Sequence, residues 1–302
     1  MQLLTPVAIP PQGIALTHST RLLSVGSCFA DEMGCRLQRA GFDVLNNPFG
    51  TLYNPLSIAA NLERAWRDSP LPEELMVQHD GVWHSWMHHS RFSSPDREEC
   101  LRRCNDAIHS THCRLHNGDD TWMLVTFGTA WVYYHHGQVV ANCHKVAAQE
   151  FVRRRLTVEE IVSAWQGLLD DMVRQSHRPA SKASDGTPPT IIFTVSPIRH
   201  LSDTAHGNQL SKATLLMAEE QLVEQYPFCH YFDSYEILID ELRDYRYYAR
   251  DMCHPSELAA DIIFERFCAA YMSPSTIRQC ALNEKAARGA AHHTIIDNNP
   301  AS

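Results

Sequence analysis

The chain lacks the motifs of a zinc ribbon, a dithiol redox centre and a secreted protein. Its ten cysteines are scattered, and none forms a C-x-x-C pair. The first 18 residues contain three prolines and neither a basic segment nor a long apolar run, so they do not resemble a secretory signal. No stretch has the roughly 20 apolar residues that a membrane helix needs. We therefore expect a cytoplasmic protein without membrane contact, whose thiols are reduced.

Positive charge is also scarce. The chain has 26 lysines and arginines against 35 aspartates and glutamates, which gives a formal net charge of −9 at pH 7. Proteins that bind nucleic acid or anionic membranes normally carry a basic stripe. We therefore expect neither kind of partner. The sequence also contains no internal repeat and no low-complexity block.

What the sequence does contain is an ordinary globular composition, with 44% hydrophobic and 20% charged residues over 302 positions. That length is enough for one large core. We expect an extended lead-in over residues 1–20 and a single α/β domain over residues 21–274. A Trp- and His-rich insertion near residues 70–95 interrupts the domain, and residues 275–302 are expected to be a loosely attached tail.

Short apolar runs alternate with segments of helical period. The runs predict strands at residues 22–25, 42–45, 122–127, 190–195 and 230–232, and a small hairpin at 132–140. The helical periods cover residues 29–39, 56–66, 96–114, 156–174, 211–225 and 256–270. Thr157 and Glu160 have the spacing of a capping box. The alternation predicts a central parallel sheet of about five strands with helices on both faces.

In such a sheet, ligands bind beyond the carboxyl ends of the strands. The segments with chemical character fall at those ends: Ser27, Gly50, Gly128, the pair Ser196-Pro197, and Asp251 with His254. Five loops are therefore expected to converge on one edge, which is where we expect the functional site.

A serine, a histidine and an aspartate supply the nucleophile, the base and the orienting acid of a serine hydrolase. Ser27 follows Gly26 at a strand-to-helix turn, and Asp251 precedes His254 by three residues. The N-terminus of the following helix would favour developing negative charge. The structural alternative for Ser27 is a helix N-cap. Two thiols, Cys28 and Cys143, are rival nucleophiles.

The histidines of the insertion offer a different chemistry. His84 and His88 have the i, i+4 spacing of metal ligands on a helix, but no glutamate follows His84 as in H-E-x-x-H. We favour an insertion that packs over the sheet edge and walls the pocket, and we expect no metal or organic cofactor.

The motifs resemble those of the GSCFA domain family, which in turn resembles the SGNH/GDSL hydrolases. The resemblance covers roughly residues 20–272 and rests on Gly26-Ser27-Cys28-Phe29-Ala30, Asn47-Pro48-Phe49-Gly50, Trp83-His84-Ser85, Ala141-Asn142-Cys143-His144-Lys145, Ser196-Pro197-Ile198-Arg199-His200 and residues 245–255. It implies a flavodoxin-like three-layer fold, a Ser-His-Asp triad, and esterase, deacetylase or acyltransferase activity.

Carried over by position, the resemblance makes Ser27 the nucleophile, His254 the base and Asp251 its orienting acid. The N–H groups of Ser27 and Gly50 would hold the oxyanion. Ala130 stands where the hydrolases have an oxyanion asparagine, so Asn142 or His200 is expected to supply the missing donor. The remaining candidates for substrate contact are Asn47, Gly128, Thr129 and Arg199.

The sequence thus predicts a serine hydrolase that acts on a small-molecule or carbohydrate acyl ester. An acyltransferase with the same triad is an alternative. A catalytically weak binding module, favoured by Ala130, and a metal-dependent hydrolase at the His84 region are two others. Substrate identity and oligomeric state stay open.

Overall fold

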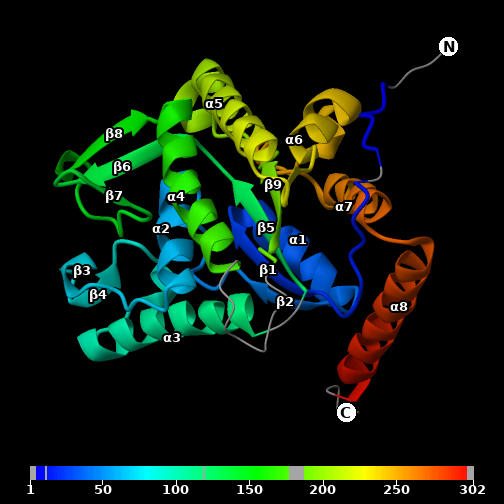
Figure 1. The fold of residues 1–302 in the computed structure, drawn as a ribbon, viewed down its shortest axis with the longest axis horizontal. Helices are drawn as coiled ribbons and strands as arrows, with labels where there is room; N and C mark the ends of the chain where they lie inside the picture. Colours follow the sequence, from blue (N-terminus) through cyan, green and yellow to red (C-terminus); the bar gives the residue numbers. More distant parts are fainter. Residues whose placement is uncertain (1–4, 11, 118–119, 177–186, 298–302) are drawn as a thin grey trace.

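The computed structural model describes residues 5–10, 12–117, 120–176 and 187–297, with side chains as far as residue 287. Five parallel strands form its central sheet: β1 (Arg21–Gly26), β2 (Asp43–Asn46), β5 (Thr121–Phe127), β9 (Thr190–Val195) and β10 (Cys229–Tyr231). Their spatial order is β10-β9-β5-β1-β2 (Figure 1). Counted along the chain this is the order 2-1-3-4-5, which is flavodoxin-like.

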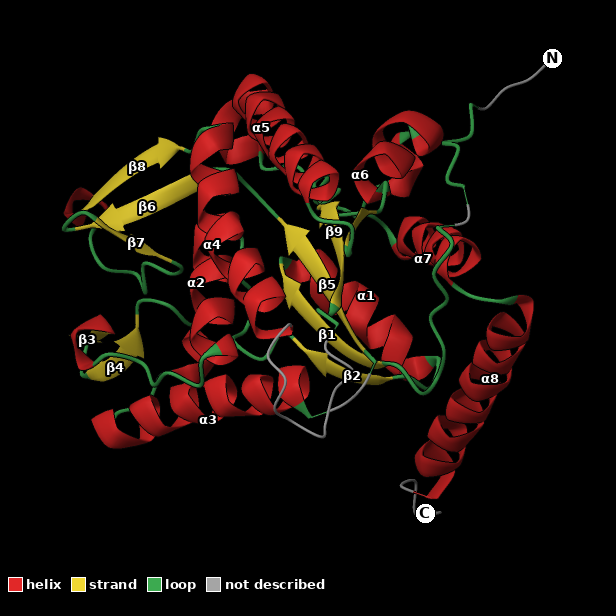
Figure 2. Cartoon of the chain, viewed as in Figure 1, coloured by secondary structure: helices red, strands yellow, loops and turns green. Residues whose placement is uncertain are grey.

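Helices cover both faces of the sheet, because alternate residues of each strand point to opposite sides (Figure 2). Leu22, Leu124 and Ile192 pack with α1 (Cys28–Arg39) and α7 (Glu257–Tyr271). Leu23, Val125 and Phe193 belong to the core on the other face. The helices of that face are α2 (Pro55–Trp66), α3 (Arg97–His116), α4 (Val158–Ser176) and α5 (Thr204–Gln225). The predicted three-layer α/β fold is confirmed.

The ends of the predicted elements agree with the structure to within two residues in most cases. The capping box at the start of α4 is present: Glu160 N donates to Thr157 Oγ1 over 3.3 Å, and Thr157 N donates to the Glu160 carboxylate over 2.9 Å. The exception is α5, which begins seven residues before the expected Ser211.

Two small antiparallel sheets lie outside the central one. In the insertion, β3 (Met76–His79) and β4 (Val82–Ser85) form a hairpin, for which the sequence analysis predicts no strands. The sequence signal is the Asp80-Gly81 turn, where both residues have positive φ. The second sheet contains β6 (Trp131–His135), β7 (Gln138–Val140) and β8 (Phe151–Arg155). β8 was not predicted because its exposed arginine run shows no apolar alternation.

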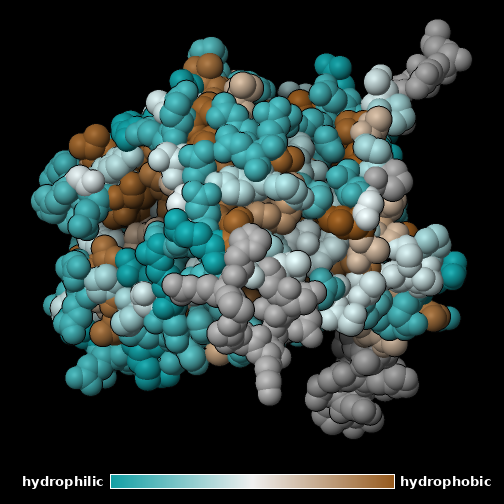
Figure 3. All heavy atoms as spheres, viewed as in Figure 1, coloured by the Kyte–Doolittle hydropathy of each residue, from teal (hydrophilic) through white to brown (hydrophobic). Residues whose placement is uncertain are grey.

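Short helical turns connect these elements. They are η1 (Glu73–Leu75), η2 (Ser90–Phe92), η3 (Ala148–Glu150), η4 (Leu201–Asp203), α6 (Ser234–Glu236), the π-helical η5 (Ile237–Leu242) and η6 (Tyr245–Tyr247). Over the described ranges, no helix combines the length and apolarity needed to cross a bilayer. The viewed surface is largely hydrophilic, with an apolar hollow near β7 (Figure 3).

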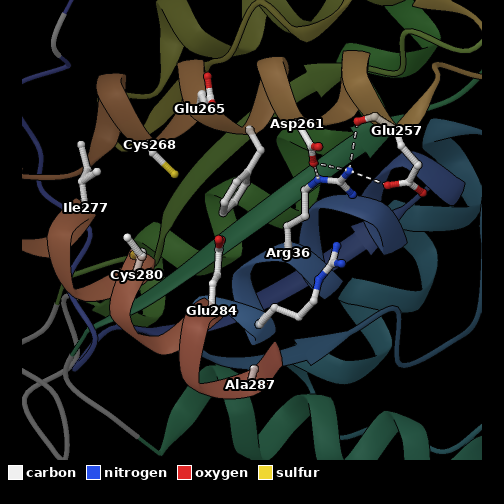
Figure 4. Close-up of a pocket in the computed structure, with 12 residues that line it drawn as sticks. Arg36, Glu257, Asp261, Glu265, Cys268, Ile277, Cys280, Glu284 and Ala287 are labelled. Atoms are coloured by element: carbon white, nitrogen blue, oxygen red, sulfur yellow. Dashed lines mark hydrogen bonds and ion pairs between the residues drawn. The ribbon is translucent and has the colours of Figure 1, made fainter. Parts of the chain in front are cut away.

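The segment expected to be a tail begins as α8 (Pro274–Asp297). Its first turns contact the body of the fold: Cys280 is buried, and Asn283 Nδ2 donates to Ala40 O over 2.9 Å. Between α1, α7 and α8 lies a cavity of about 870 Å³ (Figure 4).

Arg36 ties α1 to α7 at one side of this cavity. Its side chain is only 3% exposed and donates to Asp261 Oδ1 over 2.8 Å and to Glu257 Oε2 over 3.1 Å (Figure 4). The carboxylates themselves are mostly in water, so the buried arginine stem contributes through packing as well as charge.

We expect Arg36→Ala to lower the free energy of unfolding by about 1–3 kcal/mol, because packing and the ion pairs with Glu32, Glu257 and Asp261 are lost together. Urea unfolding of the purified protein measures the change. Arg39→Ala is the matched control: Arg39 lines the same cavity but is exposed, so its removal should change stability by less than about 0.5 kcal/mol. Equal losses in the two variants would contradict the role given to Arg36.

Candidate functional site

The turn between β1 and α1 places Ser27 at the carboxyl edge of the sheet. Gly26 has a φ of +137°, and a Cβ added there would lie 2.1 Å from Thr126 O of β5, so only glycine fits. Gly26 N donates to Asn47 Oδ1 over 2.8 Å, and Asn47 Nδ2 approaches Ser27 O at 3.4 Å. Asn47 is fully buried and holds the turn in place.

Ser27 itself is the N-cap of α1. It is 1% exposed, and its Oγ accepts from Phe29 N over 3.2 Å. Ser27 therefore does have the structural role of a helix N-cap, and its hydroxyl lies at the N-terminus of α1.

His254 and Asp251 form the pair that their spacing predicts. His254 Nδ1 lies 2.5 Å from Asp251 Oδ2, while Asp251 Oδ1 accepts from the backbone N–H groups of Cys253 and His254 over 2.9 and 3.0 Å. These two backbone bonds and then the imidazole contact lower the pKa of Asp251 to about 2. Because the carboxylate is ionised, it can fix the orientation of the half-exposed imidazole.

The other imidazole nitrogen of His254 faces the β1–α1 turn, but at Cys28. His254 Nε2 lies 3.6 Å from Cys28 Sγ. Within the described part of the chain, His254 makes no hydrogen bond to Ser27. Burial raises the pKa of the Cys28 thiol. Both residues line a cavity of about 140 Å³, together with Ile198 and Ala260.

The backbone donors expected to hold an oxyanion already have carbonyl partners. Ser27 N donates to Thr126 O over 3.2 Å, and Gly50 N to Asn47 O over 2.8 Å. The N–H groups of Gly128 and Thr129 both donate to Tyr53 O, over 2.8 and 3.0 Å. An incoming oxyanion would have to replace one of these bonds.

The two side chains considered as the further donor lie in different places. Asn142 belongs to the insertion side: its Oδ1 accepts from His144 N over 2.9 Å, and its Nδ2 approaches Ser90 Oγ at 3.4 Å. His200 lies beside Tyr53, with ring centroids 6.2 Å apart, and its buried Nε2 has no partner among the described residues. Burial, with a contribution from Lys212, lowers the pKa of His200 to about 4, so the ring is neutral near pH 7.

Arg199 contacts the segment that contains His254. Its N–H donates to Cys253 O over 3.0 Å, its guanidinium donates to Met252 O over 3.2 Å, and it stacks 5.3 Å from the Tyr248 ring centre. Arg199 therefore joins the loop after β9 to the segment that carries the Asp–His pair.

The histidines of the insertion have structural partners. His84 lies on a strand, with Nδ1 2.5 Å from Ser93 Oγ, and the fully buried His88 lies 2.9 Å from Ser85 Oγ. Burial lowers the pKa of His88 to about 3. Since residues 82–85 are not helical, the i, i+4 argument for a metal site at His84 and His88 does not apply.

Lys212 also lies at this edge of the sheet. It is fully buried on α5, and its Nζ donates to Gly128 O and Ser196 O, each over 2.7 Å. It thereby joins the loops that follow β5 and β9. Burial lowers the pKa of Lys212 to about 7. The sequence signal is a lysine and a glutamate, Lys212 and Glu219, in a helical stripe with Leu215 and Leu222.

The chain is thus a doubly wound α/β protein with a hydrogen-bonded Asp–His pair next to the strand-to-helix turn between β1 and α1. The chain belongs to the GSCFA family, whose family model matches residues 21–267. No curated protein and no solved structure gives a significant match.

The buried side chain of Glu219 should make the stability of the folded state depend on pH. Its carboxyl is fully buried, and neither oxygen has a hydrogen-bond partner among the described residues, so burial raises its pKa well above the ordinary value. The folded state keeps the proton that the unfolded state releases above about pH 4.5. Wild-type stability should therefore fall as the pH rises through this range.

Glu219→Gln removes this titration, so it should stabilise the protein by at least about 1 kcal/mol more at pH 8 than at pH 4.5. Urea unfolding at the two pH values measures the difference, and Glu220→Gln, on the exposed neighbour, is the control. A pH-independent effect of Glu219→Gln would mean that Glu219 is ionised in the folded state and pairs with Lys212.

Proposed function

We propose that the chain is a serine hydrolase of acyl esters, of the SGNH/GDSL type that its motifs resemble. The observation that carries the proposal is the Asp251–His254 pair, in which His254 Nε2 faces the turn that bears Ser27 and Cys28. A base next to a nucleophile, oriented by a third group, is the arrangement of acyl-transfer enzymes.

In the proposed reaction, Ser27 Oγ attacks the acyl carbonyl and His254 Nε2 takes the hydroxyl proton. The tetrahedral intermediate collapses, and the leaving alcohol receives that proton. Water, deprotonated by His254, then attacks the acyl-serine. The bond between the acyl carbon and Ser27 Oγ breaks, Ser27 Oγ takes the proton back from His254, and the acid is released. The first step requires His254 Nε2 to move from Cys28 to Ser27 Oγ.

The environment supports a small acyl group. The cavity beside His254 measures about 140 Å³, and its wall contains the apolar side chains of Phe29, Ile198 and Ala260 as well as Glu32 and Glu257. We propose a short acyl chain, on a small molecule or a carbohydrate, as the group transferred. The neutral His200, with its buried unpartnered Nε2, is our choice for the side chain that contacts the developing oxyanion. The cytoplasmic location expected from the sequence stays a prediction.

A fluorophosphonate probe with peptide mapping tests the proposal. We expect labelling at Ser27. It should slow by about 100-fold or more in His254→Ala, because general-base catalysis contributes about that factor. Asp251→Asn should also slow it, since the imidazole loses its orienting acceptor. His109→Ala, at an exposed position of α3, is the control, and this variant should be labelled as the wild type is. A wild-type protein that is folded yet unlabelled at Ser27 would exclude the serine mechanism.

Cys28 is the second candidate nucleophile, favoured by its 3.6 Å contact with His254 Nε2. Against it, burial raises its pKa, whereas catalytic thiols normally have a lowered one. Iodoacetamide at pH 7 distinguishes the two. We expect Cys28 to react no faster than the exposed Cys35, and Cys28→Ser to keep its fluorophosphonate labelling at Ser27. Rapid alkylation of Cys28 that depends on His254, with labelling of Ser27 lost in Cys28→Ser, would favour the thiol.

A further inference from the structure

The β6–β7 hairpin and η3 bring two histidines and a glutamate together at the outer end of the small three-stranded sheet. His135 ends β6 opposite Gln138 of β7, and His136 and Gly137 form the two-residue turn with φ values of 47° and 80°. His135 also pairs with Phe151 of β8, and Glu150 directly precedes Phe151. The strand register therefore places Glu150 beside the two imidazoles. Figure 1 shows this sheet at the left, away from α1 and α7.

The three side chains have the separation of metal ligands. One ligand atom from each of His135, His136 and Glu150 lies within 4.8 Å of the other two. Zinc binds imidazole nitrogen and carboxylate oxygen at about 2.0–2.2 Å, which places its ligand atoms about 3–3.5 Å apart. The gap is small, and the side chains of His136 and Glu150 are exposed, so rotations about their side-chain bonds can close it.

Among the described residues, none of the three side chains has another polar partner. Across the described residues, neither imidazole nor the Glu150 carboxylate makes a hydrogen bond or an ion pair. Two of the three arginines of the adjoining strand β8 are already paired with carboxylates: Arg153 with Asp203, and Arg154 with Glu160. The third, Arg155, lies opposite Trp131 at the other end of the strand. The donor atoms are thus available, and a bound cation would meet little competition from these arginines.

The orientation of one imidazole is fixed by packing. The His135 ring lies 4.7 Å from Trp86 and 5.5 Å from Phe151, measured between ring centres. Contacts of this kind hold a ligand in place before the metal binds, and outer contacts commonly tune metal affinity.

We propose that His135, His136 and Glu150 bind a divalent transition-metal ion, with Zn²⁺ as the best fit. Two imidazole nitrogens and one carboxylate oxygen suit zinc and leave a fourth position for water. The ion would join the β6–β7 hairpin to η3 and so clamp the outer end of the small sheet. This site is separate from Ser27 and His254, and it does not depend on the hydrolase proposal.

Zn²⁺ titration of the untagged full-length protein by calorimetry tests the site. We expect one ion per chain, with affinity reduced at least about tenfold in His136→Ala and in Glu150→Gln, because each removes one of three ligands. Circular dichroism checks that the variants fold. His109→Ala is the matched control, since His109 is another exposed histidine, with a carboxylate (Asp68) at 3.1 Å and a thiol (Cys113) at 3.6 Å. It should bind as the wild type does.

Co²⁺ as a spectroscopic substitute identifies the ligand type. Nitrogen and oxygen ligation gives visible d–d bands without a near-ultraviolet thiolate charge-transfer band, and these bands should disappear in His136→Ala. A thiolate band would assign the ion to the cysteines and overturn the proposal. So would the absence of Zn²⁺ binding, or binding that His136→Ala and Glu150→Gln leave unchanged.

Discussion

The arrangement of the loops at the carboxyl edge of the sheet depends on one constraint, the close approach of Gly26 to Thr126. No side chain fits at Gly26, because an added Cβ would lie 2.1 Å from Thr126 O. The same turn is held from the other side by Asn47, which accepts from Gly26 N. Strands β1, β2 and β5 are thus joined at the point where the strand order reverses, which is where doubly wound folds bind ligands. The position of Ser27 follows from these contacts.

A second set of contacts fixes the neighbouring loops. Lys212 donates hydrogen bonds to the carbonyls of Gly128 and Ser196. Arg199 donates to the segment that contains His254. A buried lysine is costly unless its donors are satisfied, so its presence indicates that the relative position of these two loops matters to the protein. The backbone N–H groups of Gly50 and Gly128 likewise donate to backbone carbonyls. The edge is therefore closed and well bonded as it stands.

Much of this could be predicted from the sequence, and the reasons are local. Continuous apolar runs such as residues 122–127 specify buried parallel strands, and Asp251 with His254 can pair because residues three apart lie close together in a tight segment. The side-chain direction at the start of α1 could not be predicted. Successive helical residues point about 100° apart, so whether Ser27 or Cys28 faces His254 depends on how a distant segment docks. The contacts of Asn142 with Ser90 and His144 could not be predicted for a similar reason, since they depend on the packing of the insertion.

The hydrogen bonds around His254 have a mechanical consequence. Asp251 is bonded to the backbone and ring of its own segment, His254 O accepts from Ala249 N, and Ser256 N donates to Tyr247 O. The segment from Tyr247 to Ser256 is therefore held together by its own hydrogen bonds, and Arg199 ties it to the loop after β9. A rotation of the segment that breaks its bonds to Arg199 leaves the Asp–His pair intact. A small rotation of this segment would move the His254 imidazole along the first turn of α1, from the Cys28 thiol to the Ser27 hydroxyl. The internal hydrogen bonds of the segment would be preserved.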